Sequence, residues 1–193
     1  ELSKVFSDHI ILLTSSTLQS NLALENIPLP KNIIHQFAPV DNYYVLGSFL
    51  DYWKPKMALF SELDIWPLRT SKVKERKIPL LLINTRMDEK KKASRKRLGK
   101  LFSVPLKEFD HIFLQDQPSK LHLMEFGVDE VKTTVNGPLK LAGTIFPDTR
   151  DVEKKLNILF KDKLIWAAAS LHESEENEIL EAYKIAKQHL PNL

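Results

Sequence analysis

Two carboxylates stand two positions apart directly after an apolar run of the chain. The run Lys56–Phe60 leads through Ser61 to Glu62 and Asp64, which a tryptophan and a proline follow. In an α/β protein the carboxyl ends of parallel strands are where ligands bind, and isolated buried carboxylates are costly, so packing alone explains this pair poorly. The alternative is that both acids cap the helix after the strand, because Asp and Glu suit a helix N-terminus. The sequence leaves both interpretations open.

Hydroxyl groups follow an earlier apolar run, His9–Leu13. Four of them stand in a row, namely Thr14, Ser15, Ser16 and Thr17. At a turn from strand to helix such side chains cap the helix, and they can also donate hydrogen bonds to an anion or a sugar. The two roles are compatible, so this turn is a candidate for both.

A third polar turn, Asn84–Arg86, follows the run Leu80–Ile83. Arg86 could bind a carboxylate or a phosphate through two parallel hydrogen bonds. It could equally be a surface arginine that pairs with Asp88 or Glu89. The residue types do not decide between these two roles.

A polar loop follows the run Leu164–Ala168 and contains Ser170, His172 and Glu175. A serine, a histidine and a carboxylate together could indicate nucleophilic catalysis. The chain lacks a GxSxG sequence, however, and residues adjacent in sequence seldom form a catalytic triad. We therefore expect a loop before a capped helix, which could still bind an anionic ligand through its backbone N–H groups.

The segment Lys90–Lys100 concentrates basic residues after the third polar turn. It could contact an anionic lipid surface, where each basic residue gains about 1 kcal/mol, or a phosphorylated acceptor. It could also be a solvated helix face, which is usual for a run of charges. No aromatic residue is interleaved with these charges, which argues against nucleic-acid binding.

The composition is that of an ordinary globular protein. The 193 residues are 43% hydrophobic and 27% charged, and the formal net charge of +3 does not select a nucleic-acid partner. No cysteine is present, which excludes disulfides and thiolate metal sites. No two histidines have the HExxH spacing, so we expect no metal, and neither common nucleotide-binding glycine motif occurs. No apolar run approaches the roughly 18 residues that a bilayer span requires.

Short apolar runs alternate with segments of helical character. The runs are His9–Leu13, Ile33–Phe37, Met57–Phe60, Leu80–Ile83, His111–Leu114, Lys132–Val135 and Leu164–Ala168. Most are continuous, which is typical of strands buried on both faces. Helices are expected at Asp41–Trp53, Leu68–Arg76, Ser94–Val104, Pro118–Phe126, Asp151–Phe160 and Ser174–Leu190. This alternation predicts an α/β fold, a Rossmann-like parallel sheet with flanking helices.

The segment Pro138–Arg150 breaks the alternation, because it has two prolines, a glycine and no clear period. We expect a first domain at 1–137, a linker at 138–150 and the start of a second Rossmann-like domain at 151–193. The last part is too small to bury its own core. The chain opens at Glu1 without a methionine and closes at Leu193 within a helical pattern, so we expect it to belong to a longer protein.

Six short elements, taken in order, resemble one known family. They are Thr14–Thr17, Pro39-Val40-Asp41, Glu62-Leu63-Asp64-Ile65-Trp66-Pro67, Asn84-Thr85-Arg86, Gly137-Pro138-Leu139-Lys140, and Ala169-Ser170-Leu171-His172 with Glu175-Glu176. Their order and spacing, from about Leu12 to Glu178, resemble the 3-deoxy-D-manno-octulosonic acid (Kdo) transferases of lipopolysaccharide synthesis. The chain departs from the family pattern where the family has Asn, Asn, Thr and Pro-Gly, at Leu68, Pro138, Leu171 and Glu173-Ser174.

The resemblance implies a GT-B glycosyltransferase with two Rossmann-like domains, of which this chain would hold most of the N-terminal, acceptor-side one. Such an enzyme moves Kdo from CMP-Kdo to a lipid A precursor, inverts the anomeric centre and uses no metal or cofactor. It works on the cytoplasmic face of the bacterial inner membrane, so its partners are both substrates and a membrane surface rather than nucleic acid. The resemblance also places the general-base glutamate before Glu1 and the main CMP contacts after Leu193, so this chain alone is expected to be inactive.

The same resemblance implies roles for individual residues. Glu62 would support catalysis from the wall of the cleft, while Asp64 and Trp66 would fix the turn after the strand and belong to the substrate-binding residues. Arg86 and Lys140 would offset negative charge on the donor or on acceptor phosphates.

Substrate contacts are further implied for the turn Thr14–Thr17 and for Ser170, His172 and Glu175. The reaction needs a base for an acceptor hydroxyl and stabilisation of the departing CMP. Two alternatives stay open at this point. One is another GT-B enzyme that acts on a nucleotide sugar, and the other is a non-catalytic Rossmann-like binding module.

Overall fold

The computed structural model describes residues 2–142, 148–161 and 164–190. The chain divides into two compact units, Glu1–Thr144 and Ile145–Leu193. This division falls inside the expected linker, of which residues 143–147 lie outside the described residues. The domain boundaries expected from the sequence stay a prediction.

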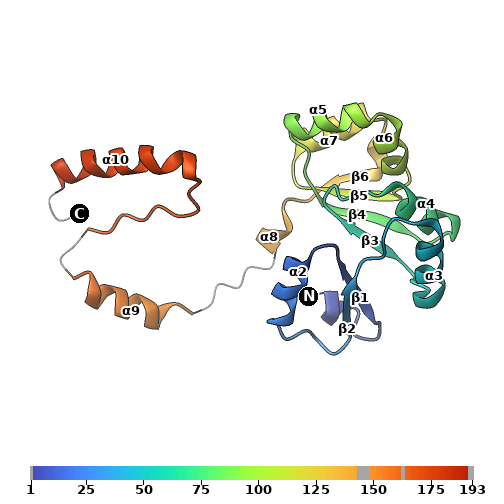
Figure 1. The fold of residues 1–193 in the computed structure, drawn as a ribbon, viewed down its shortest axis with the longest axis horizontal. Helices are drawn as coiled ribbons and strands as arrows, with labels where there is room; N and C mark the ends of the chain where they lie inside the picture. Colours follow the sequence, from blue (N-terminus) through green and yellow to red (C-terminus); the bar gives the residue numbers. More distant parts are fainter. Residues whose placement is uncertain (1, 143–147, 162–163, 191–193) are drawn as a thin grey trace. The chain divides into compact units, whose positions relative to one another are not determined.

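The first unit contains a parallel sheet of four short strands (Figure 1). In order across the sheet they are β3 (Ala58–Ser61), β4 (Leu80–Thr85), β5 (His111–Leu114) and β6 (Thr133–Val135). Each neighbouring pair is parallel, and Ile112 pairs with Leu82 on one side and with Thr133 on the other. The Rossmann-like α/β class expected from the sequence is confirmed.

Helices connect and cover these strands. They are α3 (Tyr43–Trp53), α4 (Pro67–Glu75), α5 (Glu89–Leu98), α6 (Lys100–Lys107), α7 (Gln117–Glu125) and α8 (Leu139–Ala142), with a 3-10 turn η1 at Glu130–Lys132. Figure 1 shows α5, α6 and α7 gathered on one side of the strands, and α3 beside α4. The single helix expected at Ser94–Val104 is wrong, because Gly99, with a φ of 54°, separates α5 from α6. Glycine adopts a positive φ without the steric penalty of a Cβ atom. The helix α8 lies inside the segment expected as a linker.

The hydrophobic core lies between this sheet and its helices. Leu80, Leu82, Ile112, Leu114 and Leu123 have no exposed surface. Full burial of such a side chain stabilises the fold by roughly 1.5–3 kcal/mol. The core therefore gives the ends of β4 and β5 a rigid base.

A smaller sheet precedes the four-stranded one. The strands β1 (Ile11–Ser15) and β2 (Ile33–Phe37) pair in parallel, and the helices α1 (Leu2–Val5) and α2 (Leu18–Glu25) belong to the same part of the chain. The prediction of one sheet is wrong, since the described strands form two. No described residue of these four elements is buried, so none of them contributes to the buried core of the first unit.

The described part of the second unit consists of two helices and the chain between them. The elements are α9 (Arg150–Leu159), a 3-10 turn η2 (Glu173–Glu175) and α10 (Glu176–His189). The strand expected at Leu164–Ala168 is wrong, because this segment has no strand partner among the described residues. A strand needs a neighbour to receive its backbone hydrogen bonds. The Trp166 ring instead stacks on Tyr183, with centroids 6.0 Å apart.

Candidate active site

The carboxyl ends of β3, β4, β5 and β6 lie along one edge of the sheet, because the four strands run in parallel. The hydrogen-bond ladder continues for one residue past three of these strands. The backbone N–H groups of Glu62, Gln115 and Asn136 donate to the carbonyl oxygens of Ile83, Thr85 and Leu114, at 2.9, 2.9 and 3.0 Å. The polar residues that follow these strands therefore share the edge at which parallel sheets bind ligands.

Glu62 occupies a strained turn directly after β3. Its φ of 61° is a left-handed conformation, which costs a non-glycine residue on the order of 1–3 kcal/mol. The buried side chain of Leu63 anchors the turn, and Arg95 Nη2 donates to Leu63 O at 3.4 Å. The Glu62 side chain is exposed and has no hydrogen-bond partner among the described residues. Strain of this kind concentrates at functional sites, and here it presents a carboxylate that a ligand can reach.

Asp64 and Trp66 fix each other after this turn. Trp66 Nε1 donates to Asp64 Oδ1 at 2.7 Å, and the guanidinium of Arg69 lies 5.5 Å from the centroid of the Trp66 ring. Neither Glu62 nor Asp64 caps α4, because the Arg69 N–H donates to Asp41 Oδ1 at 2.9 Å. The capping alternative for the two acids is therefore wrong.

Asn84, near the end of β4, joins three strand ends. Its φ of 54° is left-handed, which asparagine tolerates better than most residues. Gln115 Nε2 donates to Asn84 O at 2.8 Å and to Asn84 Oδ1 at 3.0 Å. The Leu139 N–H donates to the same Oδ1 at 3.1 Å. As a result α8, which carries Lys140, begins beside this edge of the sheet.

Arg86 extends from the same turn toward the next strand end. Its Nε lies 3.6 Å from Asp116 Oδ2, and 63% of its side chain stays exposed. The expected alternative, a pair with Asp88 or Glu89, is wrong, because Asp88 caps α5 and Glu89 pairs with a lysine of its own helix. Hydrogen bonding from Ser119 holds the pKa of Asp116 below its ordinary value; the charge of Arg86 adds to this effect and partial burial opposes it. Arg86 therefore faces an ionised carboxylate and keeps most of its guanidinium available.

The hydroxyl-rich turn Thr14–Thr17 lies at the end of β1, on the smaller sheet. Thr17 caps α2 by accepting from the Ser20 N–H at 3.2 Å, as expected from the sequence. Ser15 Oγ and His35 Nε2 are hydrogen-bonded at 2.9 Å. Within the described chain, no hydrogen bond or ion pair joins the side chains of this turn to the polar residues after β3 and β4. The substrate role of the turn stays a prediction.

Ser170, His172 and Glu175 belong to the second unit. Ser170 has a φ of 60°, and the His172 N–H donates to Glu175 Oε2 at 2.9 Å. No hydrogen bond between Ser170 and His172 occurs in the described residues, so they form no catalytic triad here. The expected loop before a helix is present, and its ligand contacts stay a prediction.

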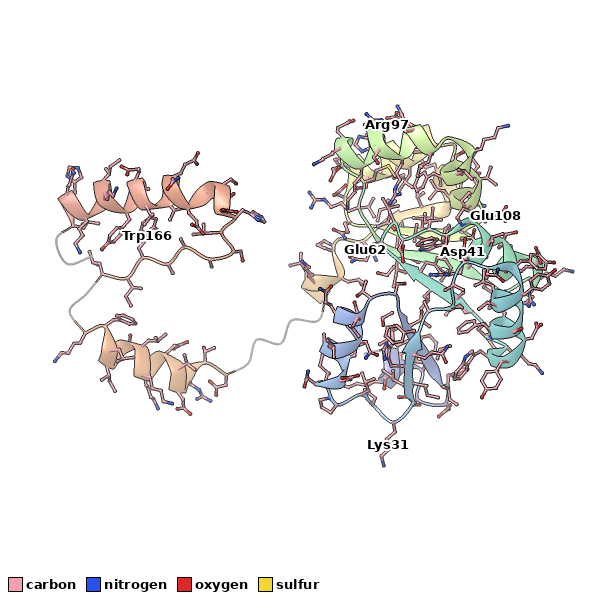
Figure 2. All side chains as sticks on the ribbon, in the orientation of Figure 1. Lys31, Asp41, Glu62, Arg97, Glu108 and Trp166 are labelled. Atoms are coloured by element: carbon pink, nitrogen blue, oxygen red, sulfur yellow. The ribbon has the colours of Figure 1, made fainter. Side chains whose placement is uncertain are left out.

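The basic segment Lys90–Lys100 is partly structural. Lys92 and Lys96 of α5 pair with Glu125 of α7 at 3.1 and 2.8 Å. Hydrogen bonds from Lys96 and then Lys92 lower the pKa of Glu125 from 4.5 to about 2. These two lysines hold α5 against α7, whereas Arg97 projects from the outer side of α5 (Figure 2).

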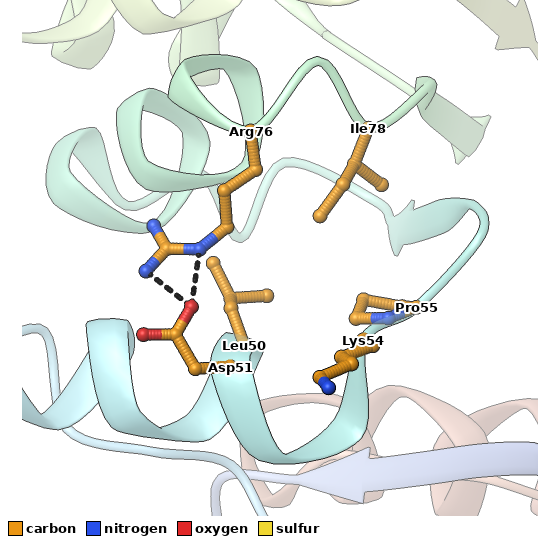
Figure 3. A pocket seen from close by; sticks show the side chains of 6 residues that line it. All are labelled: Leu50, Asp51, Lys54, Pro55, Arg76 and Ile78. Carbon is orange, nitrogen blue, oxygen red and sulfur yellow. Dashed lines mark hydrogen bonds and ion pairs between the residues drawn. The ribbon is translucent and has the colours of Figure 1, made fainter.

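A cavity of about 390 Å³ lies away from these residues (Figure 3). Its lining consists of Leu50, Asp51, Lys54, Pro55, Arg76 and Ile78. Pro55 precedes β3 and Ile78 precedes β4, so the cavity is at the amino ends of these strands. Arg76 Nε and Nη2 both donate to Asp51 Oδ1, at 2.9 and 2.8 Å, and this pair joins α3 to the end of α4.

No group of three or more His, Asp or Glu side chains in the part of the chain that the structure describes is arranged to hold a metal ion. None of the described helices has the length and the apolar character needed to cross a bilayer.

Several residues that hold the candidate site in place were not predicted from the sequence. Gln115 and Asp116 directly follow the apolar run of β5, which is the same kind of position that drew attention to Glu62. That signal was available in the sequence. The role of Asp41 as the cap of α4 was not, because Asp41 lies 28 positions before the residue that it binds.

Comparison with known proteins identifies the family. Residues 1–142 match the 3-deoxy-D-manno-octulosonic-acid transferase (kdotransferase) family. The chain is 32% identical over 189 residues to a 3-deoxy-D-manno-octulosonic acid transferase of Rickettsia bellii, covering 98% of this chain and 44% of that protein. It is 25% identical over 166 residues to the Haemophilus influenzae transferase of the same name, covering 84% of this chain and 38% of that protein. The chain thus spans less than half the length of these relatives.

A solved structure supports the fold. A Listeria monocytogenes protein assigned as a UDP-N-acetylglucosamine 2-epimerase superposes with a TM-score of 0.56 at 12% identity, covering 95% of this chain and 52% of that one. This likeness concerns the fold alone and agrees with the Rossmann-like architecture of a GT-B protein. The match over residues 1–142 decides the family, and the chain belongs to the 3-deoxy-D-manno-octulosonic acid transferases.

Proposed function

We propose that the full-length protein transfers Kdo from CMP-Kdo to a lipid A precursor, with inversion at the anomeric carbon. The observation that supports this most strongly is the family match over residues 1–142. Within the matched residues, Glu62 and Arg86 follow the neighbouring strands β3 and β4 at one edge of the sheet. The Kdo group follows from the family. The donor nucleotide and the acceptor are inferred from the resemblance of the sequence motifs.

In the proposed reaction a base removes the proton of an acceptor hydroxyl, and the oxygen attacks the anomeric carbon of Kdo. The bond from that carbon to the CMP phosphate oxygen breaks, and CMP leaves with the electron pair. Arg86 and Lys140 would stabilise the negative charge on phosphate oxygens. Glu62 would orient the acceptor by accepting hydrogen bonds from its hydroxyl groups, since its carboxylate is exposed at the edge.

Further substrate contacts are proposed for polar residues outside this edge. The hydroxyls of Thr14–Thr17 would donate to a sugar or an anion, and the loop with Ser170, His172 and Glu175 would face the donor. Both roles require the two units to close on the substrates during turnover. The chain spans less than half the length of its relatives, and we expect the 193-residue chain alone to show no Kdo transfer.

The proposed reaction needs no metal and no cofactor, because positive side chains and helix N-termini can stabilise the departing CMP. Treatment of the full-length protein with EDTA, followed by gel filtration, should leave the rate of Kdo transfer unchanged. A rate that falls after this treatment and returns with added Mg²⁺ or Mn²⁺ would contradict this part of the proposal.

The outer surface of α5 and α6 is proposed to face the membrane at the cytoplasmic side of the inner membrane. The side chains of Lys90, Lys91 and Arg97 have no hydrogen-bond or ion-pair partner among the described residues. Leu101 and Val104 of α6, the next helix along the chain, are exposed apolar side chains. Basic residues together with exposed apolar ones suit an anionic bilayer, where each basic residue adds about 1 kcal/mol to the binding free energy.

Vesicle sedimentation tests this surface. Reversing Lys91 and Arg97 to glutamate in the full-length protein should weaken binding to phosphatidylglycerol vesicles at least about tenfold. Reversal of Lys4 and Lys31, two exposed lysines in α1 and before β2 (Lys31 is labelled in Figure 2), changes the net charge by the same amount; it is the matched control and should have little effect. Equal losses for both surfaces would show that only net charge matters.

The transfer itself is tested with the full-length protein, CMP-Kdo and a lipid A precursor. The expected product is the precursor with Kdo attached, detected by mass spectrometry, and free CMP should inhibit more strongly than UDP. Stronger inhibition by UDP, with no Kdo product, would favour another nucleotide-sugar enzyme of the same fold. No product and no binding of either nucleotide would favour a non-catalytic module.

A further inference from the structure

The segment Gln115–His122 holds the Asn84–Met87 turn residue by residue. Gln115 binds Asn84, Asp116 pairs with Arg86, and Ser119 and His122 bind Met87. Asp116, Ser119 and His122 are three positions apart, which places their side chains on one face of the helix. The backbone on both sides of Arg86 is therefore fixed by one short segment.

The contacts after Arg86 are buried. The Met87 N–H donates to Ser119 Oγ at 2.8 Å, and His122 Nδ1 donates to Met87 O at 2.7 Å. Met87 is 1% exposed and Ser119 has no exposed surface. Because an unpaired buried N–H or C=O group is costly, Met87 cannot shift without a large penalty.

The side-chain contacts before Arg86 come from Gln115, which binds both oxygens of the left-handed Asn84, and the Leu139 N–H adds a third hydrogen bond, to Asn84 Oδ1. Thr85, between Asn84 and Arg86, is fully buried, and its Oγ1 has no hydrogen-bond partner within the described chain. Its hydroxyl therefore does not hold the turn. The turn is held by Gln115 and by Ser119 and His122, which lie on one face of α7.

We propose that Gln115 and Ser119 are positioning residues, which hold the guanidinium of Arg86 at the carboxyl edge of the sheet for an anionic group of the substrate. This inference rests on the proposed function, because it assigns a phosphate of donor or acceptor to Arg86. Asp116 sets the direction of the Arg86 side chain through the 3.6 Å ion pair, and Gln115 and Ser119 set the position of its backbone.

A double-mutant cycle on kcat/KM of the full-length protein tests the proposal. The variant Gln115→Met removes the donor at similar size, and Arg86→Ala removes the group that it positions. Gln115→Met should lower kcat/KM about 10- to 100-fold in the native background, since small misplacements are costly in catalysis. In the Arg86→Ala background the further loss should be no more than about twofold, because the two residues act as one unit.

Ser119→Ala should behave in the same way as Gln115→Met. Thr85→Val is the matched control within the turn, and it should keep kcat/KM within about twofold of native because it removes a hydroxyl without a partner. If Gln115→Met and Ser119→Ala reduce kcat/KM equally with and without Arg86, the two residues act on general stability and the proposal is overturned.

Amide hydrogen exchange separates this inference from the proposed function. In the native full-length protein the Met87 N–H should be strongly protected, and Ser119→Ala should reduce its protection at least about tenfold. If the Met87 N–H is equally protected in Ser119→Ala and in the native protein, Ser119 does not hold the turn and the inference is overturned, whatever reaction the protein catalyses. If the native protein transfers no Kdo but Ser119→Ala exposes Met87, the proposed function fails together with the role of Arg86, while the hold on the turn stands.

Discussion

Two apolar runs of this chain, Leu80–Ile83 and Leu164–Ala168, have similar sequences and different structures. The first lies in β4 between two parallel neighbours, and Leu80 and Leu82 have no exposed surface. The second forms no strand, and Leu164, Ile165 and Trp166 are all exposed, Ile165 to 60%. The sequence predicts a strand for both.

The difference shows that an apolar run forms a strand only where other segments of the chain pack beside it and over it. A strand in a parallel sheet needs hydrogen-bond partners on its sides and helices over its faces. In the first unit β3, β5 and the helices around them supply both. Among the described residues of the second unit, no strand supplies hydrogen-bond partners for Leu164–Ala168, so its apolar side chains stay in contact with water.

The largest expected effect contrasts the two runs directly. Leu82→Ala should lower the free energy of unfolding of the first unit by about 2–5 kcal/mol, because it opens a cavity in the core. Ile165→Ala should change stability by no more than about 0.5 kcal/mol, because that side chain is already exposed. Urea unfolding of both variants of this chain gives the two numbers, and similar losses would remove the contrast.

A smaller effect is expected where a distant residue caps a helix. Asp41 Oδ1 accepts from the Arg69 N–H, so Asp41→Ala should destabilise the first unit by about 0.5–2 kcal/mol. The matched change Asp151→Ala, in the first turn of α9, removes no cap bond in the described structure and should cost less. Thermal unfolding of both variants compares them, and a larger loss for Asp151→Ala would contradict this account of α4.

The smallest effect concerns acid. Because the pKa of Glu125 is lowered to about 2 from 4.5, its pairs with Lys92 and Lys96 stabilise the fold above pH 4.5 and are lost as the pH falls toward 2. Glu125→Gln should therefore reduce the dependence of stability on pH between these values. Glu178→Gln, at an exposed position of α10, is the control. Identical acid unfolding profiles for native protein and Glu125→Gln would refute the assignment.

Much of the fold follows from local sequence patterns. The strands Ile33–Phe37 and His111–Leu114 have the predicted bounds, and most other elements agree to within a few residues. These features depend on residues that are neighbours in the chain. The division into two sheets and the missing strand at Leu164–Ala168 depend on which segments meet in space, which periodicity does not contain.

The residues of the candidate site also divide into those that could be predicted from the sequence and those that could not. Glu62 and Arg86 could be selected from the sequence, because acids and arginines directly after apolar runs stand out. The left-handed backbone of Glu62 could not, since glutamate has no preference for a positive φ. The contacts of Gln115 with Asn84 and of Ser119 with Met87 cross more than 30 positions and appear only once β4 and β5 pair.

The central claim is that the carboxyl ends of β3 and β4 serve Kdo transfer. The most direct measurement compares the same chemical change at the two ends of the strands, Glu62→Gln at the candidate site and Asp51→Asn at the cavity before them. In full-length protein with unchanged thermal stability, Glu62→Gln should lower the rate of Kdo transfer at least about tenfold, and Asp51→Asn should leave it within about twofold. Native transfer rates in Glu62→Gln, or equal losses in both variants, would contradict the claim.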